Sequence, residues 1–185
     1  MKIIGINGSG RIGGNTYQLV KAVLSGAAQA GAETKLFELG SLVIRPCNAC
    51  RACKETHECV INDDMQQIYQ LLPTTDVLVL GSPIYLDHIT AQMMTFIQRL
   101  YCYLGQNLEI FYPHKGTKAV LGITYAADWY KAYDFVLDWM EARLSEYYGI
   151  ETIARFKITS TKHDNPVGED HPVIKQAYEF GKTLA

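Results

Sequence analysis

Residues 2–16 read KIIGINGSGRIGGNT, and the architecture can be worked out from this stretch. The apolar run at residues 3–6 is short and rich in isoleucine, which is typical of a strand buried in a parallel sheet. A glycine-rich loop follows, and apolar residues then recur at helical spacing, at Leu19, Val20, Val23, Leu24 and Ala27. The stretch therefore predicts a strand, a loop and a helix, with the loop at the carboxyl end of the strand.

The same alternation continues along the chain. Further apolar runs predict strands at residues 35–39, 77–80, 119–124 and 152–158, and amphipathic segments predict helices at 65–72, 93–100, 135–144 and 173–184. Parallel neighbours need right-handed crossovers, so we expect a doubly wound three-layer α/β sandwich around a five-stranded parallel sheet. No repeat or linker divides residues 1–185, which are expected to form one domain with a long irregular segment at 40–62.

Composition and charge exclude several classes of protein. The 185 residues include 17 basic and 19 acidic side chains, a formal net charge of -2. No basic cluster of the kind that binds nucleic acid or an anionic membrane is present. The longest uncharged apolar run, residues 77–86, is about half as long as a transmembrane helix, so no membrane span is expected. The sequence starts with a strand pattern in place of a secretory signal, which predicts a cytoplasmic protein.

The glycine-rich loop has four polar side chains around the predicted start of the first helix: Ser9, Arg11, Asn15 and Thr16. Its pattern G-x-G-x-x-G is a weakly specific sign of a dinucleotide site, and the G-K-[ST] pattern of a P-loop is absent. Hydroxyls, a guanidinium and free backbone amides suit a terminal phosphate monoester. We interpret the loop, including Gly14, as the phosphate cradle of a mononucleotide. The alternative is an ordinary turn in which Asn15 or Thr16 caps the helix.

A second candidate segment follows the third predicted strand, at the same edge of the sheet. It reads GSPIY at residues 81–85, and Gly81 and Pro83 are expected to stop the strand. Tyr85 then stands at the mouth of the cleft. A planar ligand would gain there from an aromatic or proline ring against its face and from backbone amides along its edge.

Four of the five cysteines are clustered in the long irregular segment, at Cys47, Cys50, Cys53 and Cys59. Their spacing, C-x2-C-x2-C-x5-C, allows four thiolates to surround a [4Fe-4S] cluster. Disulfides are not expected in a reducing compartment, and zinc sites more often have two separated C-x2-C pairs. The competing interpretation is four free thiols packed beside a partner subunit. The fifth cysteine, Cys102, is expected to be buried.

As a set, these motifs resemble the flavodoxin-fold NAD(P)H-dependent FMN reductases and, within that group, the iron-sulfur flavoproteins. The resemblance rests on GSGR at residues 8–11, GNT at 14–16, Pro46-Cys47, DDM at 63–65, GSPIY at 81–85, and Ala91-Gln92 before Phe96, Ile97 and Arg99. It covers residues 1–100 well and the remaining 85 residues only loosely. It implies a flavodoxin-like sheet with strand order 2-1-3-4-5.

The resemblance also implies bound FMN. The implied phosphate contacts are Ser9, Arg11, Gly14, Asn15 and Thr16, and the implied ring contacts are Pro83, Ile84, Tyr85, Thr124 and Tyr125. The sequence departs from the family at Met94 and Gln98, where lysine and aspartate are common, and at Tyr125, where glycines are common. A bulky Tyr125 beside the ring bears directly on the shape of the substrate pocket.

The predicted function is that of an FMN-dependent oxidoreductase, which takes electrons from NAD(P)H and passes them to a flavin, a quinone or an electron-carrier protein. No protein acid or base is assigned. The first alternative is an iron-sulfur flavoprotein that carries electrons to or from a ferredoxin-like partner. The second is a non-enzymatic module of the same fold with structural zinc.

The remaining expectations concern the oligomeric state and the position of the cysteine segment. Loops at the edge of one domain leave much of a flavin ring exposed, so a homodimer or homotetramer is expected. The surface proposed for it is aromatic: Tyr101, Tyr103, Phe111 and Tyr112. The cysteine segment leaves the carboxyl end of the second strand, so the thiols are expected on the same rim as the flavin loops.

Overall fold

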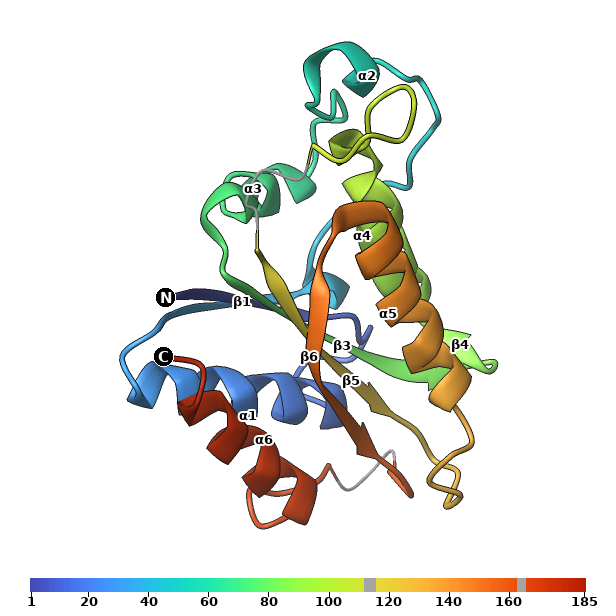
Figure 1. Cartoon of the computed structure of the whole chain (residues 1–185). Coiled ribbons are helices and arrows are strands. Elements are labelled where there is room, and N and C mark those ends of the chain that lie inside the picture. Colours follow the sequence, from blue (N-terminus) through green and yellow to red (C-terminus); the bar gives the residue numbers. More distant parts are fainter. Residues whose placement is uncertain (112–115, 163–165) are drawn as a thin grey trace.

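The computed structural model describes residues 1–111, 116–162 and 166–185, and these residues form a layered structure around a mainly parallel sheet (Figure 1). The strands are β1 (Lys2–Asn7), β2 (Glu33–Glu38), β3 (Val77–Tyr85), β4 (His88–Ile89), β5 (Lys118–Thr124) and β6 (Glu151–Ile158). Five of them lie in the order β2-β1-β3-β5-β6, and β4 pairs with β3 outside this row. With β5 and β6 as the fourth and fifth parallel strands, the predicted order is confirmed.

Helices cover both faces of the sheet, as the doubly wound prediction requires. α1 (Asn15–Gln29) and α6 (Pro172–Lys182) pack on one face, and α3 (Met65–Tyr69), α4 (Ala91–Arg99) and α5 (Asp134–Tyr148) pack on the other. The short helices are η1 (Leu39–Ser41), α2 (Cys53–Thr56), η2 (Leu72–Thr74) and η3 (Leu100–Tyr103). Within the described ranges, no helix combines the length and the apolar content that crossing a membrane would require.

Two apolar layers join the sheet to its helices. Successive strand residues point to opposite faces, so along β3 Leu78 belongs to the layer under α4 and α5, and Val79 belongs to the layer under α1 and α6. α1 and α6 also approach each other closely. A Cβ at Gly26 would lie 2.0 Å from the carbonyl oxygen of Tyr178 in α6, so this close approach of the two helices depends on glycine.

β3 continues beyond the point where the sequence predicts its end. Gly81 and Pro83 are predicted to stop it, but the strand runs to Tyr85 and turns back into β4. Pro83 is tolerated because β1 pairs with β3 only as far as Gly81, so beyond that point the strand has β5 alone as a parallel neighbour. The tip of the hairpin holds Leu86 and Asp87, both with positive φ (45° and 64°), and Leu86 is fully exposed.

The cysteine segment is tied down where it leaves the fold and where it returns. The Arg45 amide donates to the Asp63 carboxylate (2.9 Å), and the Val43 amide donates to the Asp64 carboxylate (2.7 Å). Arg99, at the end of α4, is only 2% exposed and bridges the two limbs. Its guanidinium donates to both Asp63 oxygens (2.6 and 3.2 Å) and to the Arg45 carbonyl (2.8 Å). We call residues 43–45, residues 61–64 and Arg99 the neck.

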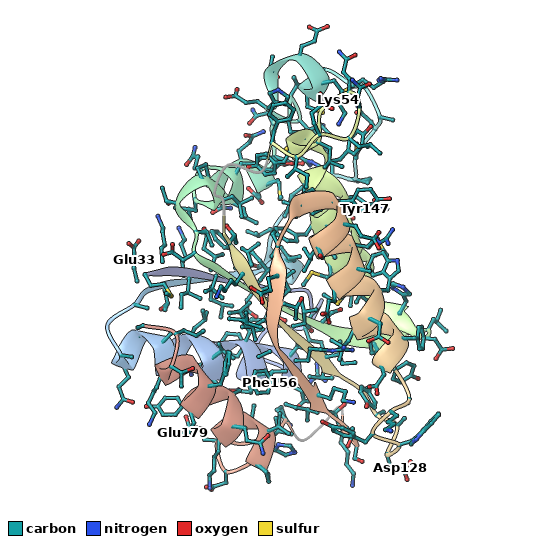
Figure 2. The ribbon with its side chains drawn as sticks, in the orientation of Figure 1. Glu33, Lys54, Asp128, Tyr147, Phe156 and Glu179 are labelled. Atoms are coloured by element: carbon teal, nitrogen blue, oxygen red, sulfur yellow. The ribbon has the colours of Figure 1, made fainter. Side chains whose placement is uncertain are left out.

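Beyond the neck, the cysteine segment lies at one end of the molecule, beside η3. The sequence predicts it at the opposite end, on the rim that carries the flavin loops. Lys54 in this segment donates to the carbonyl oxygens of Tyr101 in η3 and of Leu104 just after it. Figure 2 shows Lys54 at one end of the molecule and Asp128, in the loop after β5, at the other. α4 and η3 together span about 20 Å between the two ends.

The physical reason for this difference lies directly after η1. Leu42 and Ile44 pack against the apolar layer under α4 and α5, and this contact leads the chain away from the rim and along the sheet. The prediction that the thiols share a rim with the flavin loops of the same chain is therefore wrong.

The aromatic surface proposed for assembly is only partly exposed. Tyr103 is 7% exposed and packs edge-on against Tyr69, with ring centroids 5.9 Å apart, so its assignment to a surface is wrong. Tyr101 and Phe111 are exposed, as predicted. Tyr112 lies outside the described residues.

Candidate functional site

Three loops meet at the carboxyl end of the parallel strands. The Gly8 amide, after β1, donates to the Gly81 carbonyl of β3 (2.7 Å). The hydroxyls of Thr16 in α1 and Thr124 at the end of β5 share a buried hydrogen bond of 2.8 Å. Thr90, which begins α4, donates its hydroxyl to the Gly8 carbonyl (2.6 Å). The loops after β1, β3 and β5 therefore lie together at one end of the sheet.

The loop after β1 is shaped by its own hydrogen bonds. The Asn7 side-chain oxygen accepts from the Ser9 amide (3.1 Å), and the Ser9 hydroxyl oxygen accepts from the Arg11 amide (3.0 Å). Ser9 is buried and Arg11 is half-buried. The Ser9 oxygen accepts from this amide, so the hydroxyl hydrogen remains for a ligand.

Helix α1 opens directly onto this loop without a side-chain cap. Its N-cap residue is Gly14, and no acidic residue lies in its first turn. The first amides of a helix have no partner inside the helix and favour a bound anion. An uncapped helix start beside the Ser9 hydroxyl and the Arg11 backbone fits a phosphate monoester. Neither Asn15 nor Thr16 caps the helix as the alternative of a plain turn requires, because Gly14 holds the N-cap position.

Asn15 and Thr16 each have a partner within the protein. The Asn15 side-chain oxygen accepts from the Val167 amide (2.7 Å), which brings the segment before α6 against the loop. Thr16 is 2% exposed, and its hydroxyl is engaged by Thr124. The donors that these two residues offer a phosphate are therefore the Asn15 side-chain NH2 group and the backbone amides of α1.

The side of the site formed by β3 is apolar and open. Pro83 and Ile84 are half-buried, and Tyr85 is 51% exposed. These residues lie where β3 has left β1 and turns into β4, so their outer surface is not covered by a neighbouring parallel strand on that side. A planar ligand fits against such an edge.

Tyr125 is turned into the protein. Its amide donates to the Ile158 carbonyl (3.0 Å), its carbonyl accepts from the Thr161 amide (3.1 Å), and its hydroxyl donates to the Tyr130 carbonyl (2.7 Å). The ring packs edge-on against Tyr133 and is 3% exposed, and burial raises the pKa of this phenol to about 12. The bulky residue that replaces the usual glycines therefore does not fill the open side of the site.

Sequence reasoning misses three residues that shape the site. Thr90 bonds the Gly8 carbonyl, and the Ser82 hydroxyl oxygen accepts from the Thr90 amide (3.1 Å). Glu38, the last residue of β2, accepts hydrogen bonds from the loop after β1. A threonine before a helical pattern is a known start signal and identifies Thr90 as a cap. Ser82 and Glu38 have no local signal, because their partners lie elsewhere in the sequence.

The thiols of the four clustered cysteines lie close enough to affect one another's charge. Burial raises the pKa of the Cys53 thiol, Cys47, Cys50 and Cys59 raise it further, and Lys54 lowers it. Across residues 1–111, 116–162 and 166–185, no group of three or more His, Cys, Asp or Glu side chains is placed to hold a metal ion. The donor type suits an iron-sulfur cluster or zinc, whereas the arrangement does not.

Comparison with known proteins assigns the family. The sequence pattern of the NADPH-dependent FMN reductases matches residues 1–130. The chain belongs to this family. Membership confirms the resemblance to the FMN reductases that the motifs predict.

Two relatives of this FMN reductase family member are iron-sulfur flavoproteins. The one from Methanocaldococcus jannaschii is 39% identical over 99 residues, which are 54% of this chain and 51% of the relative. The one from Methanosarcina thermophila is 36% identical over 99 residues, which are 54% of this chain and 52% of the relative. The matched stretch thus spans about half the length of these relatives.

Solved structures confirm the flavodoxin-like architecture. An NAD(P)H:quinone oxidoreductase from Methanothermobacter marburgensis has a TM-score of 0.76 at 12% identity, over 100% of this chain and 96% of the other. A flavone reductase has a TM-score of 0.71 at 17% identity, over 100% and 62%. At these identities, the likeness shows the fold alone.

Proposed function

We propose that this chain binds FMN across the loops after β1, β3 and β5, takes electrons from NAD(P)H, and passes them to a flavin, a quinone or an electron-carrier protein. One observation carries the proposal: the uncapped start of α1 lies beside the Ser9 hydroxyl and Arg11, at the rim where three strands end. The family assignment supports it independently.

Each group of the loop has a separate task in binding the phosphate. Ser9 donates its hydroxyl hydrogen, because its oxygen already accepts from the Arg11 amide. The Arg11 guanidinium supplies positive charge, and charge-assisted hydrogen bonds are about twice as strong as neutral ones. The first amides of α1 and the Asn15 side-chain NH2 group complete the donor set.

The other two loops orient the ring. FMN, when bound, supplies the hydride-accepting and electron-passing chemistry, so the chain has to hold and orient it. Pro83 and Ile84 offer apolar atoms, and Tyr85 offers an exposed aromatic ring. The bond between Thr16 and Thr124 ties the loop after β5 to the helix that receives the phosphate, which fixes the ring side of the site relative to the phosphate side.

A second candidate function is that of an electron carrier that contains an iron-sulfur cluster and works with a ferredoxin-like partner. The cysteine spacing and the names of two relatives favour it. Because α4 and η3, about 20 Å long together, separate Lys54 in the cysteine segment from the phosphate loop of its own chain, this candidate requires a homodimer or homotetramer in which a neighbour's flavin lies closer. The non-enzymatic alternative is set aside, because the family consists of oxidoreductases.

The phosphate assignment is tested with Arg11→Ala. A hydrogen bond to a charged group contributes about 1.5–3 kcal/mol, so FMN binding should weaken roughly tenfold or more. Riboflavin lacks the phosphate, and its affinity should change by less than about twofold. Both ligands are titrated by flavin fluorescence. An equal loss for FMN and riboflavin would contradict the proposed phosphate site.

The reaction is tested separately, without oxygen. NADH and NADPH oxidation is followed with the FMN-loaded chain and one acceptor at a time: a quinone, free FMN or a ferredoxin. Acceptor-dependent oxidation supports the proposed reductase. Bound FMN that neither nucleotide reduces would contradict it.

A further inference from the structure

Glu38 places a carboxylate against the glycine-rich loop. It is the last residue of β2, and one of its carboxylate oxygens accepts from the Asn7 side-chain NH2 group (3.2 Å) and from the Gly13 amide (3.2 Å). Asn7 is fully buried, and its own side-chain oxygen holds the Ser9 amide (3.1 Å). The carboxylate is therefore built into the loop and is not a mobile surface charge.

The chain after Glu38 fixes this arrangement further. Residues 39–41 form η1, and Gly40 lies so close to the loop that a Cβ on it would be 2.7 Å from the Ser9 carbonyl oxygen. The end of β2 and the loop after β1 are thus packed together. This contact holds the backbone beside Glu38 against the loop.

This position matters because the loop has the pattern of a dinucleotide site. In a G-x-G-x-x-G loop, backbone amides and the following helix start receive a pyrophosphate. Here the last glycine of the pattern, Gly13, already donates its amide to a carboxylate. Arg11 is the sole basic residue between positions 8 and 16. Under the proposed function, Arg11 neutralises one phosphate, whereas a second phosphate at Gly13 would lie against the Glu38 charge.

We propose that Glu38 is a specificity residue that limits this loop to a ligand with a single phosphate, so that FMN binds and FAD is rejected. The inference rests on the proposed binding of FMN phosphate at this loop. It adds a mechanism of discrimination: Glu38 occupies one amide donor and opposes the charge of a second phosphate.

The test compares wild type with Glu38→Gln. Glutamine keeps the shape and an acceptor oxygen for Gly13 and Asn7 but removes the charge. The full chain, freed of flavin, is titrated calorimetrically with FMN, FAD and riboflavin. The preference of FMN over FAD should fall about fivefold or more in Glu38→Gln, while FMN affinity stays equal or rises. Added NaCl should lower the ratio of FMN affinity to FAD affinity in wild type and leave this ratio nearly constant in Glu38→Gln.

Glu33→Gln is the matched control. Glu33 is the first residue of β2, and its exposed carboxylate lies 3.9 Å from the Lys2 ammonium group, at the other end of the strand from the loop. This variant should keep the wild-type preference. A change as large as that of Glu38→Gln would overturn the inference, because the effect would then not depend on the position of the charge.

Two outcomes separate this inference from the function on which it rests. If wild type binds riboflavin as tightly as FMN, the phosphate site itself is wrong, and the proposed function fails. If FMN binds more tightly than riboflavin but the FMN preference over FAD is the same in wild type and Glu38→Gln, the phosphate site stands and the role of Glu38 is wrong. Glu38→Ala adds a further check: a changed preference in this variant alone would assign the effect to loss of the loop contact and overturn the charge mechanism.

Discussion

Replacing Asp63 with asparagine removes the carboxylate that neutralises the buried Arg99 guanidinium in the neck. Both side chains are almost inaccessible, with exposed fractions of 3% and 1%. The guanidinium also donates to the Arg45 carbonyl, so the arginine stays in place when the charge of its partner is lost. Asp63→Asn therefore leaves a buried cation without an anion, which is the costly way to break a buried ion pair.

The expected loss in the free energy of unfolding follows from the hydrogen bonds that Asp63→Asn changes. Asp63 accepts two bonds from Arg99 and one each from the Arg45 and Met65 amides, and hydrogen bonds to charged groups contribute about 1.5–3 kcal/mol each. Asparagine retains one acceptor oxygen, so we expect a loss of about 3 kcal/mol, the lower end of the range for broken buried pairs. For a chain of this size, that loss lowers the midpoint of thermal unfolding by roughly 6–12 °C.

The assay is urea denaturation followed by circular dichroism, with Asp138→Asn as the control. Asp138 pairs with Arg155 at the same 2.6 Å separation, but the two side chains are 65% and 35% exposed. An exposed pair contributes at most about 1 kcal/mol. Equal losses in the two variants, or a loss below about 1 kcal/mol for Asp63→Asn, would refute the argument that burial makes this pair important.

The same pair has a pH signature. Burial by itself would raise the pKa of Asp63, but the Arg99 hydrogen bonds and the amides of Arg45 and Met65 outweigh it and lower the pKa below its ordinary value of 3.8. A carboxyl with a lower pKa in the folded state stabilises the fold above its unfolded pKa and loses that contribution as the pH falls through the folded value. The stability difference between wild type and Asp63→Asn should therefore be constant near neutral pH and shrink below about pH 4.

Three further predictions concern the cysteines and the assembly. Under the second candidate function, Cys50→Ser should abolish the iron and acid-labile sulfide of anaerobically reconstituted protein while FMN content stays unchanged; reconstituted wild type with FMN but no iron rejects that candidate. Cys102 is 3% exposed, and burial raises the pKa of its thiol to about 12. Cys102→Ser should therefore not alter the number of thiols that react with a disulfide reagent in the folded protein, whereas Cys47→Ser should lower that number. The exposed Tyr101 and Phe111 support a homodimer or homotetramer, and light scattering that gives a monomer of 20.7 kDa would contradict it.

The sheet could be predicted because its signal is local. Each parallel strand is a short apolar run, and each crossover helix has apolar residues at helical spacing, so order and layers follow from general rules of α/β topology. The end of β3 could not be predicted in this way. Gly81 and Pro83 normally interrupt a strand, and the hairpin that carries β3 to Tyr85 depends on pairing with β4, which is two residues long.

The phosphate loop could be located for the same local reason, but its surroundings could not. Glu38 and Gly13 are 25 residues apart, and Arg99 and Asp63 are 36 residues apart. Such contacts arise only when the whole fold is assembled, and neither residue of a pair carries a pattern that points to the other. The path of the cysteine segment cannot be predicted either, because it follows from the packing of Leu42 and Ile44 against the layer under α4 and α5.

A closed neck makes residues 46–60 an exchangeable cassette. The hydrogen bonds of Arg45, Asp63 and Arg99 join the two limbs before the cassette begins, and Lys54 in the cassette contacts the far end of the molecule, at η3, so a change in its length leaves the three-loop site in place. The entropic cost of a longer cassette is small, because doubling the length of a loop costs only about 0.6 kcal/mol. The architecture thus allows a lineage to acquire, exchange or discard the chemistry of the cassette while the nucleotide-binding rim stays as it is.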